Sequence, residues 1–347
     1  MAVRLGRGSE NNNIMFWVLI PVGPTDDDVK GAQDLIESIV TYEPTVSGIV
    51  FLDDGVKDRC LAGRFVVPST CNTISLMPSR NAGTNEFRKT GGLCAGILSG
   101  LRWIQESTEA CFVVKLDSDA LVIDPFLDKA LLSMRSLTDA GMLGSIGRSA
   151  NKDSPHFRYC DDARALLEFL LAHVPEPNSD SEANQGVEIA TPGGNVFISH
   201  DQLCSFSVLR KHIASALDNG YPLGNYCQGG AYILTRQMLE RMESRGYFED
   251  LTLWQQVPIG EDVAMSMYVY AVGLRLHGQS GDGGMFGIQW RGLPFGMNDL
   301  VVRKYSFIHS VKNEASISEA DIRAFFRERR RVRGPSGAMP MAYPYSG

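Results

Sequence analysis

The sequence has no apolar run that reaches the roughly 18 residues a membrane-spanning helix needs. Its first 13 residues are polar and rich in glycine and asparagine, without the apolar core of a secretion signal. These two absences argue against a membrane-spanning protein and against a secreted one. We therefore expect a soluble cytoplasmic protein.

Paired cysteines are absent as well. The seven cysteines are scattered, odd in number, and show neither CxxC pairs nor the spacing of a zinc site. Cys94 and Cys111 lie in apolar stretches, which is typical of small core residues. This pattern favours a reducing compartment.

An excess of positive charge is also missing, because the formal net charge of the 347 residues is -7. That balance argues against a general nucleic-acid binder and fits a protein that recruits a cation before an anionic ligand. No internal repeat is present, and the length allows one large α/β domain or two modest ones.

What the sequence does contain is a pair of carboxylates just after a short apolar run. Residues 111–114 predict a buried strand, and Asp117 and Asp119 follow it closely. Ligands of open α/β sheets bind beyond the carboxyl ends of the strands. Unpaired buried carboxylates are costly, so the pair is expected to hold a divalent cation such as Mg²⁺ or Mn²⁺, together with a phosphate. The alternative is a solvated loop.

The apolar pattern predicts an α/β fold that opens with a parallel βαβ unit. Its first strand, 16–20, is closed by Pro21, and Thr25 or Asp26 caps the helix that leads to a strand at 49–52. Asp124 is expected to cap a helix that begins at Pro125. A Gly-Gly turn at Gly229-Gly230 is expected to enter a further strand. Other strands are predicted at 73–76, 196–198 and 305–309, and other helices at 93–104, 163–173, 208–217, 236–242 and from 261 onward.

Two further segments could contact a nucleotide. Asp53 and Asp54 end the second strand, where a carboxylate can accept hydrogen bonds from a nucleobase or a ribose, or can simply form a turn with Gly55. The loop that leads into the helix at 93–104 is basic and glycine-rich, which suits an anion but equally suits a solvated loop. It lacks the order of a P-loop. Its candidate residues are Arg80, Asn81, Lys89 and Gly92.

The second acidic pair, Glu261-Asp262, opens a helix. A carboxylate there can act as a general base, or can cap the helix without any chemical role. His309 ends a strand, and a histidine beside a carboxylate-bound cation would favour Mn²⁺ over Ca²⁺, although a structural histidine is the plainer interpretation. Lys312 could meet a phosphate as a point charge.

Taken in order, these residues resemble a nucleotide-sugar glycosyltransferase of the GT-A fold, over roughly residues 15–312. The first strand with Pro21 and Val22, the Asp53-Asp54-Gly55 segment and Asp117-Ser118-Asp119 look like a GT2-like donor half. The segments Gly229-Gly230-Ala231-Tyr232, Gly260-Glu261-Asp262-Val263 and Ile308-His309 look like the acceptor half of the β1,3-galactosyltransferase and Fringe-like group.

The resemblance implies a role for each motif. Asp54 or Asp53 would touch the uridine of a UDP-sugar, and Asp117, Ser118 and Asp119 would lie at the metal and the ribose–diphosphate. His309 would be a third ligand of Mn²⁺ or Mg²⁺, acting with Asp117 and Asp119. Asp262, next to Glu261, would be the base of an inverting displacement. Gly229 and Gly230 would let the backbone approach the donor or the acceptor.

The implied fold is a single large domain with a GT-A, Rossmann-like mixed sheet flanked by helices. Its expected organisation is a flexible N-terminus (1–13), a nucleotide-sugar-binding half (14–149), an acceptor-binding and catalytic half (150–315), and a basic helix with a disordered tail (316–347). The excursion at 174–186 has no assigned role. The implied function is hexosyl transfer to a saccharide or another hydroxyl acceptor.

Two alternatives stay open: a sugar-phosphate nucleotidyltransferase, whose glycine- and lysine-containing signature after the first strand is missing, and a catalytically silent nucleotide- or sugar-binding protein. A haloacid-dehalogenase-type phosphatase would place its Asp pair after the first strand, unlike this chain.

The basic stretch 327–333 is expected to be a solvated helix end rather than a peripheral membrane contact. Trp290 or Phe286 could stack on a sugar, or belong to a buried strand.

Overall fold

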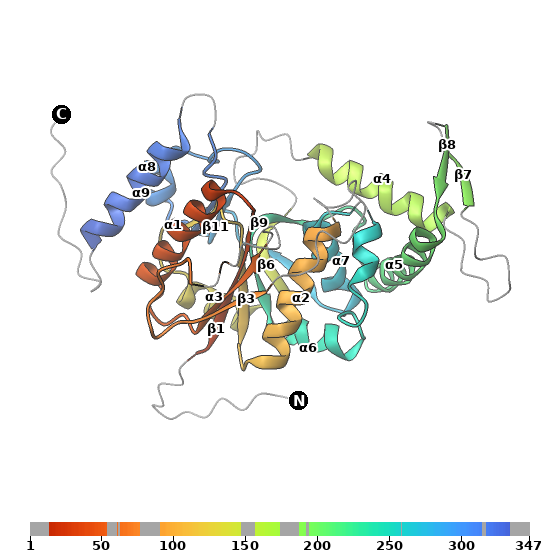
Figure 1. Cartoon of the computed structure of the whole chain (residues 1–347), viewed down its shortest axis with the longest axis horizontal. Helices are drawn as coiled ribbons and strands as arrows, with labels where there is room; N and C mark the ends of the chain where they lie inside the picture. The colour runs from red at the N-terminus through yellow and green to blue at the C-terminus, as the bar shows by residue number, and fades with distance from the viewer. Residues whose placement is uncertain are drawn as a thin grey trace.

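The computed structural model describes residues 14–53, 61, 63–76, 91–146, 157–173, 187–191, 194–257, 259–313 and 317–333. Its centre is a seven-stranded mixed sheet flanked by helices, which confirms the predicted fold class (Figure 1). The strand order across this sheet is β10 (Arg275–Gly278), β6 (Ala140–Ile146), β9 (Cys227–Thr235), β4 (Phe112–Leu116), β1 (Phe16–Val22), β2 (Gly48–Asp53) and β3 (Asn72–Leu76).

The predicted βαβ unit is present: β1 and β2 are parallel and α1 (Asp26–Tyr42) connects them. Thr25 caps α1 in a reciprocal capping box with Asp28, as this residue pattern favours. β1 continues beyond its predicted end, because Pro21 and Val22 still pair with β2. On its other side, β4 pairs only with the first four residues of β1 and stops before Pro21.

The sheet becomes antiparallel at β9, which lies between β4 and β6. Gly229 and Gly230 lie inside this continuous strand. The predicted Gly-Gly turn is therefore wrong.

Both faces of the central strands are buried, as is usual where helices cover a sheet on both sides. In β1, Phe16, Val18 and Ile20 belong to one core, and Trp17 and Leu19 belong to the other. The first core packs against α1 and α3 (Leu127–Ser136). The second packs against α2 (Gly91–Ser107), α5 (His200–Asp218), α6 (Arg236–Ser244) and α7 (Glu261–Ala271).

A small second sheet brings distant residues to the end of β4. Its order is β11 (Phe286–Ile288), β12 (Phe307–His309) and β5 (Leu121–Val122). β5 begins two residues after Asp119, and β12 pairs with it in antiparallel register. His309 therefore arrives beside the Asp117–Asp119 loop although it is 190 residues away in the sequence.

The helix α3 begins at Leu127, later than predicted, and the expected cap from Asp124 is not formed. The carboxylate of Glu43 caps it instead, accepting hydrogen bonds from the backbone N–H groups of Phe126 (2.5 Å) and Leu127 (2.8 Å). A cap from so far along the chain leaves no local signal in the sequence.

The remaining elements lie at the two sides of the molecule (Figure 1). On one side are α4 (Phe157–His173) and the hairpin of β7 (Val187–Thr191) and β8 (Gly194–Ile198), next to α5. On the other side are α8 (Met297–Val302) and α9 (Glu319–Arg333). The short 3-10 helix η2 (Thr252–Gln256) packs on α2 and α5. No helix in the described part of the chain has both the length and the apolarity to cross a membrane.

Candidate active site

Asp117, Asp119 and His309, which the resemblance implies as metal ligands, form one cluster. Each offers a ligand atom, and these atoms lie within 4.8 Å of one another. His309 Nε2 is 3.2 Å from Asp119 Oδ1 and 3.8 Å from Asp117 Oδ2. The end of β4 supplies the carboxylates, and the end of β12 supplies the imidazole.

Polar partners behind this cluster orient its three side chains. Lys115 Nζ donates to Asp117 Oδ1 (2.6 Å), and Ser310 Oγ and Lys312 Nζ both reach Asp119 Oδ2 (2.9 Å each). Each carboxylate therefore turns its other oxygen toward His309. The ring of His309 is fixed by its Nδ1, which donates to the backbone carbonyl of Gln289 (2.9 Å). Such outer hydrogen bonds typically orient metal ligands.

The charges within the cluster stabilise one another. Burial alone would raise the pKa of Asp119, but His309 and Lys312 outweigh it and hold that pKa well below its usual range. Burial would likewise lower the pKa of His309, and the charge and hydrogen bond of Asp119 raise it instead. Asp119 and His309 thus stabilise each other's charged form.

The donor set fits a small divalent cation. Mg²⁺ binds oxygen at about 2.1 Å, so two ligands at right angles lie about 3 Å apart. The 3.2 Å separation between His309 Nε2 and Asp119 Oδ1 is close to that value, and the 3.8 Å separation from Asp117 Oδ2 is longer. One nitrogen with two carboxylate oxygens suits Mn²⁺ as well as Mg²⁺.

Lys115, which sequence reasoning passed over, connects the motifs. Its side chain is 0% exposed, and its Nζ donates to Asp117, to the carbonyl of Gly229 (2.5 Å) and to Glu261 Oε1 (2.6 Å). Burial would lower the pKa of Lys115, but the two carboxylates raise it. A lysine in an otherwise apolar strand, two residues before an aspartate, was the available signal.

The two carboxylates at the start of α7 differ in their surroundings. Glu261 is buried, and both its oxygens have donors: Lys115 on Oε1 and the Tyr232 hydroxyl on Oε2 (3.3 Å). Burial raises the pKa of Glu261 to about 7, although Lys115 opposes the rise. Asp262 is half-buried, with Oδ1 accepting from the backbone N–H of Val263 (2.9 Å), and burial raises its pKa too.

A cavity of about 400 Å³ joins these groups. It brings the metal-type ligands Asp117 and His309 together with the second acidic pair in one space. The residues that line it are Leu93, Asp117, Tyr226, Gln228, Gly229, Gly230, Gly260, Glu261, Asp262, Ile288, Gln289, Trp290 and His309.

The two glycines of β9 make room for these side chains. A Cβ at Gly230 would lie 2.3 Å from ring atoms of His309, and one at Gly229 would lie 2.7 Å from Glu261 Oε1. Any larger residue would displace the imidazole or the glutamate. The groups that lie against these glycines are thus the side chains of His309 and Glu261. Contact of the glycines with a donor or acceptor stays a prediction.

Other predicted site residues lie outside the cavity lining. Pro21 and Val22 are buried in β1, and Gly92 is buried in the first turn of α2. Asp53 is buried, with Oδ2 accepting from the backbone N–H of Leu61 (3.0 Å). The carbonyl of Ser118 accepts from Arg323 Nη2 (3.4 Å). The predicted residues Asp54, Arg80, Asn81 and Lys89 lie outside the described residues.

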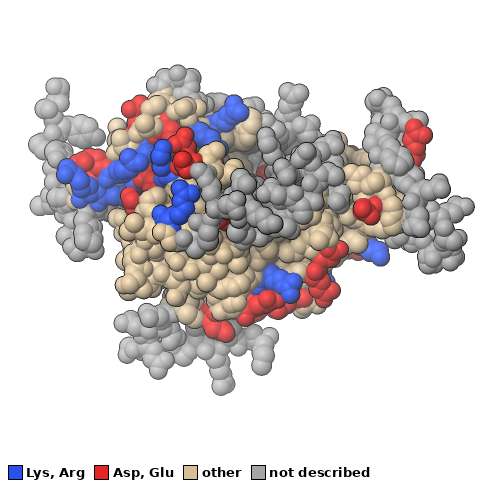
Figure 2. Space-filling model, in the orientation of Figure 1, with Lys and Arg blue, Asp and Glu red and all other residues tan. Residues whose placement is uncertain are grey.

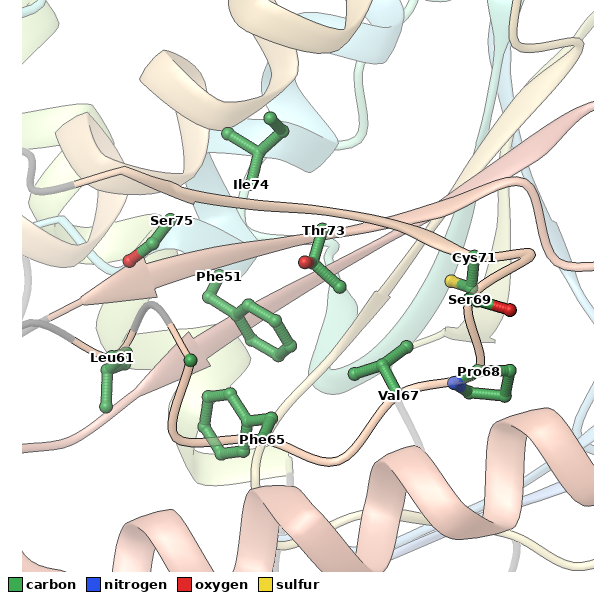
Figure 3. Close-up of a pocket in the computed structure, with 11 residues that line it drawn as sticks. Phe51, Leu61, Phe65, Val67, Pro68, Ser69, Cys71, Thr73, Ile74 and Ser75 are labelled. Carbon is green, nitrogen blue, oxygen red and sulfur yellow. The ribbon is translucent and has the colours of Figure 1, made fainter.

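A second cavity, of about 290 Å³, lies beside β2 and β3 (Figure 3). The rings of Phe51 and Phe65 stack at its side, 4.4 Å apart. None of the described residues that line it is acidic, basic or a histidine. Its described lining is apolar and hydroxyl-bearing, with one thiol, Cys71, whose pKa burial raises to about 11.

No protein-family model and no curated protein sequence matches this chain. A search of solved structures finds 354 matching chains. One of them is described as an apo structure of WbbM, a bifunctional glycosyltransferase; it is 13% identical, with a TM-score of 0.45, and the match covers 94% of this chain and 51% of that chain. This chain therefore spans about half the length of that structure.

Proposed function

We propose that this protein is a metal-dependent glycosyltransferase of the GT-A type, which moves a sugar from a nucleoside-diphosphate sugar to an acceptor hydroxyl. One observation carries the proposal: a single cavity joins the carboxylate–imidazole cluster of Asp117, Asp119 and His309 to a separate carboxylate, Asp262. A cation site would hold the leaving group, and a carboxylate would take a proton. An inverting, metal-dependent glycosyl transfer uses both.

The donor diphosphate would bind at the carboxylate–imidazole cluster. Asp117, Asp119 and His309 would hold Mn²⁺ or Mg²⁺, which supplies Lewis-acid neutralisation of the departing diphosphate. The side chain of Lys312 is 65% exposed at the edge of this cluster, where it can pair with a phosphate oxygen as a point charge. UDP is the proposed nucleotide, with Asp54 or Asp53 near its ribose or base.

Asp262 is the proposed general base. Burial raises its pKa, which makes its carboxylate a better proton acceptor than an exposed aspartate. It would take the proton of the acceptor hydroxyl while that oxygen bonds to the anomeric carbon and the bond from this carbon to the diphosphate oxygen breaks. A single in-line displacement of this kind inverts the anomeric configuration.

Glu261 is not the base in this proposal. Both its oxygens already accept hydrogen bonds, from Lys115 and from Tyr232, and the Lys115 contact links it to Asp117. It positions the start of α7, and with it Asp262, relative to the cluster. This revises the paired assignment of Glu261 and Asp262 to a base and a positioning residue.

Turnover of nucleotide sugars tests the proposal. The protein is incubated with UDP-, GDP-, CDP- and ADP-sugars, with Mn²⁺ or EDTA, and with methyl glycosides as acceptors, and the released nucleoside diphosphate is measured. We expect release with one nucleotide only, lost in EDTA and reduced about 100-fold or more in Asp262→Asn.

Asp282→Asn, at an exposed aspartate paired with Arg303, is the matched control and should keep full activity. Full turnover by Asp262→Asn would remove the proposed base. Metal-dependent nucleotide binding without turnover of any sugar would instead identify a catalytically silent binding protein.

A further inference from the structure

Trp290 is an aromatic side chain at an unusual place. Of the exposed large hydrophobic residues in the described part of the chain it is the sole aromatic one, with 52% of its surface exposed. It lines the same cavity as Asp117 and Asp262. Phe286, the other aromatic residue that the sequence suggested as a sugar contact, is fully buried in β11 and cannot reach a ligand.

The position of Trp290 is fixed relative to the metal-type cluster. Its neighbour Gln289 makes two hydrogen bonds to His309: the backbone N–H of Gln289 donates to the His309 carbonyl (2.7 Å), and its own carbonyl accepts from His309 Nδ1 (2.9 Å). The guanidinium of Arg291 lies 4.7 Å from the centre of the indole ring. An exposed indole that is held in this way presents a defined surface rather than a mobile one.

The chemistry around this surface favours a neutral polar ligand. The described residues that line the cavity include three carboxylates, Asp117, Glu261 and Asp262, and neither lysine nor arginine. An anionic acceptor at Asp262 would meet this negative charge unfavourably, whereas the donor diphosphate is paired with the proposed cation; Arg291 beside the indole offsets only part of the negative charge. Gln289 adds a polar contact, because its Oε1 is buried without a hydrogen-bond partner among the described residues, while its Nε2 donates to the Arg291 carbonyl (2.9 Å).

We infer that the acceptor is a neutral saccharide, whose ring stacks on Trp290 while one of its hydroxyls lies at Asp262. A sugar ring has an apolar C–H face and a polar rim, so an indole beside hydrogen-bonding groups complements it. Gln289, which also lines the cavity, adds a polar side chain beside this surface. That the bound saccharide is an acceptor rests on the proposed function. Its binding at Trp290 can be measured without turnover.

Tryptophan fluorescence tests the binding directly. Of the four tryptophans, Trp17 and Trp254 are buried and Trp103 is partly buried, so Trp290 is the one that a ligand in the cavity touches. The protein is titrated with methyl glycosides of glucose, galactose, mannose and N-acetylglucosamine, and separately with glucose 6-phosphate. We expect at least one neutral glycoside to change the emission saturably, and Trp290→Phe to abolish the change.

Trp103→Phe is the matched control, because Trp103 packs edge-on against Trp17 away from the cavity and should leave the change intact. With the glycoside that binds, Trp290→Ala is expected to raise the acceptor KM about tenfold, whereas Trp103→Phe should leave the acceptor KM unchanged. Gln289→Ala should raise it less.

No emission change with any neutral glycoside, an equal change in Trp290→Phe, or tighter binding of glucose 6-phosphate would overturn the inference. These outcomes are separate from a failure of the proposed function, because metal-dependent binding of a nucleoside diphosphate is measured independently in the same preparations. An unchanged acceptor KM in Trp290→Ala, with transfer still lost in Asp262→Asn, would reject stacking of the acceptor on Trp290. The proposed transferase activity would remain supported.

Discussion

Asp34 and Asp119 are both deeply buried carboxylates, with 3% and 8% of their surfaces exposed, but their partners differ. Asp34, in α1, is surrounded by three arginines of α9: Arg323 (2.9 Å), Arg327 (3.1 Å) and Arg330. Asp119 contacts His309, Ser310 and Lys312 and belongs to the cluster at the cavity.

The difference shows how a structural carboxylate is distinguished from a functional one. Both oxygens of Asp34 are occupied by guanidinium groups, which are planar, permanently charged and geometrically fixed. Asp119 has one oxygen held by Ser310 and Lys312 and the other turned to His309, an imidazole that can ligate a metal. Burial is similar at both sites, so the chemistry of the partner side chains distinguishes the structural carboxylate from the functional one.

The two sites are connected through Arg323. The same guanidinium that binds Asp34 also donates to the carbonyl of Ser118, between the two predicted metal ligands. Gly31 leaves space for this contact, since a Cβ there would lie 3.0 Å from the Ser118 carbonyl oxygen. α9 thus supports the loop that carries Asp117 and Asp119.

The largest expected effect is that of Asp119→Asn on activity. Loss of a metal-ligating carboxylate should reduce turnover about 1000-fold or more, since metal stabilisation of a leaving group is worth several kcal/mol. Metal-dependent nucleotide binding should be lost too, while circular dichroism shows an unchanged fold. Unchanged metal dependence in this variant would remove Asp119 from the metal site.

Asp34→Asn should act on stability instead. It leaves three arginines around an uncharged side chain, and breaking a buried ion pair from one side costs about 4 kcal/mol. Urea unfolding should show this loss, and the metal affinity of the folded protein should remain near that of the wild type. Glu37→Gln, at an exposed residue of the same helix, is the control. A variant as stable as the wild type would contradict the structural role.

A pH series of the unfolding free energy tests a further group, the half-buried His212. Burial lowers the pKa of His212 to about 4, so between pH 6.5 and 4 the unfolded chain binds a proton that the folded protein does not. Its contribution to stability is therefore lost as pH falls through this window, by up to about 3 kcal/mol. Asp119 stays ionised there, because its pKa lies well below its usual range.

The measurement is the difference in unfolding free energy between the wild type and His212→Phe, which should become more favourable to the variant as pH falls from 6.5 to 4. A difference is needed because Glu261, whose pKa is raised to about 7, contributes stability that is lost as pH rises from 4.5 to 7. A difference that does not change with pH would show that His212 is not buried as a neutral base.

The smallest effect is expected for Arg323→Lys. Arg323 is the residue that contacts both Asp34 and the Ser118 carbonyl. A lysine cannot reach Asp34 and the Ser118 carbonyl at the same time, so the metal affinity should fall about threefold through a looser Asp117–Asp119 loop. Calorimetric titration with Mn²⁺ measures it. Arg331→Lys, at an exposed arginine of α9, should have no effect. Equal affinities in both variants would show that α9 does not position the loop.

Sequence patterns predicted the elements and the cluster where local signals were strong. Asp117 and Asp119 follow an apolar strand, so their place beyond a sheet edge could be inferred. His309 ends β12 in the second sheet, and only the resemblance placed it beside them. The contacts of Lys115, Ser310 and Gln289 could not be inferred, because they depend on side-chain directions across three elements.

Where tertiary contacts override local signals, prediction from the sequence was wrong. Gly229-Gly230 indicates a turn locally, but the glycines lie in a strand to admit Glu261 and His309. The basic helix end was expected to be solvated. Arg331 is exposed as expected, but Arg330 is buried against Asp34, which corrects that expectation in part. Figure 2 shows basic side chains gathered over the α9 region. The spacing of Arg323, Arg327 and Arg330 on one helix face was the missed signal.

The most direct test of the proposed function is a thermal-shift measurement with UDP, GDP, CDP and ADP, each with Mn²⁺ and with EDTA. A ligand that binds only the folded protein raises the unfolding midpoint by mass action. We expect stabilisation by one nucleoside diphosphate, UDP, in Mn²⁺ and none in EDTA. No shift with any diphosphate, in protein shown to be folded, would contradict a metal–diphosphate site at Asp117, Asp119 and His309.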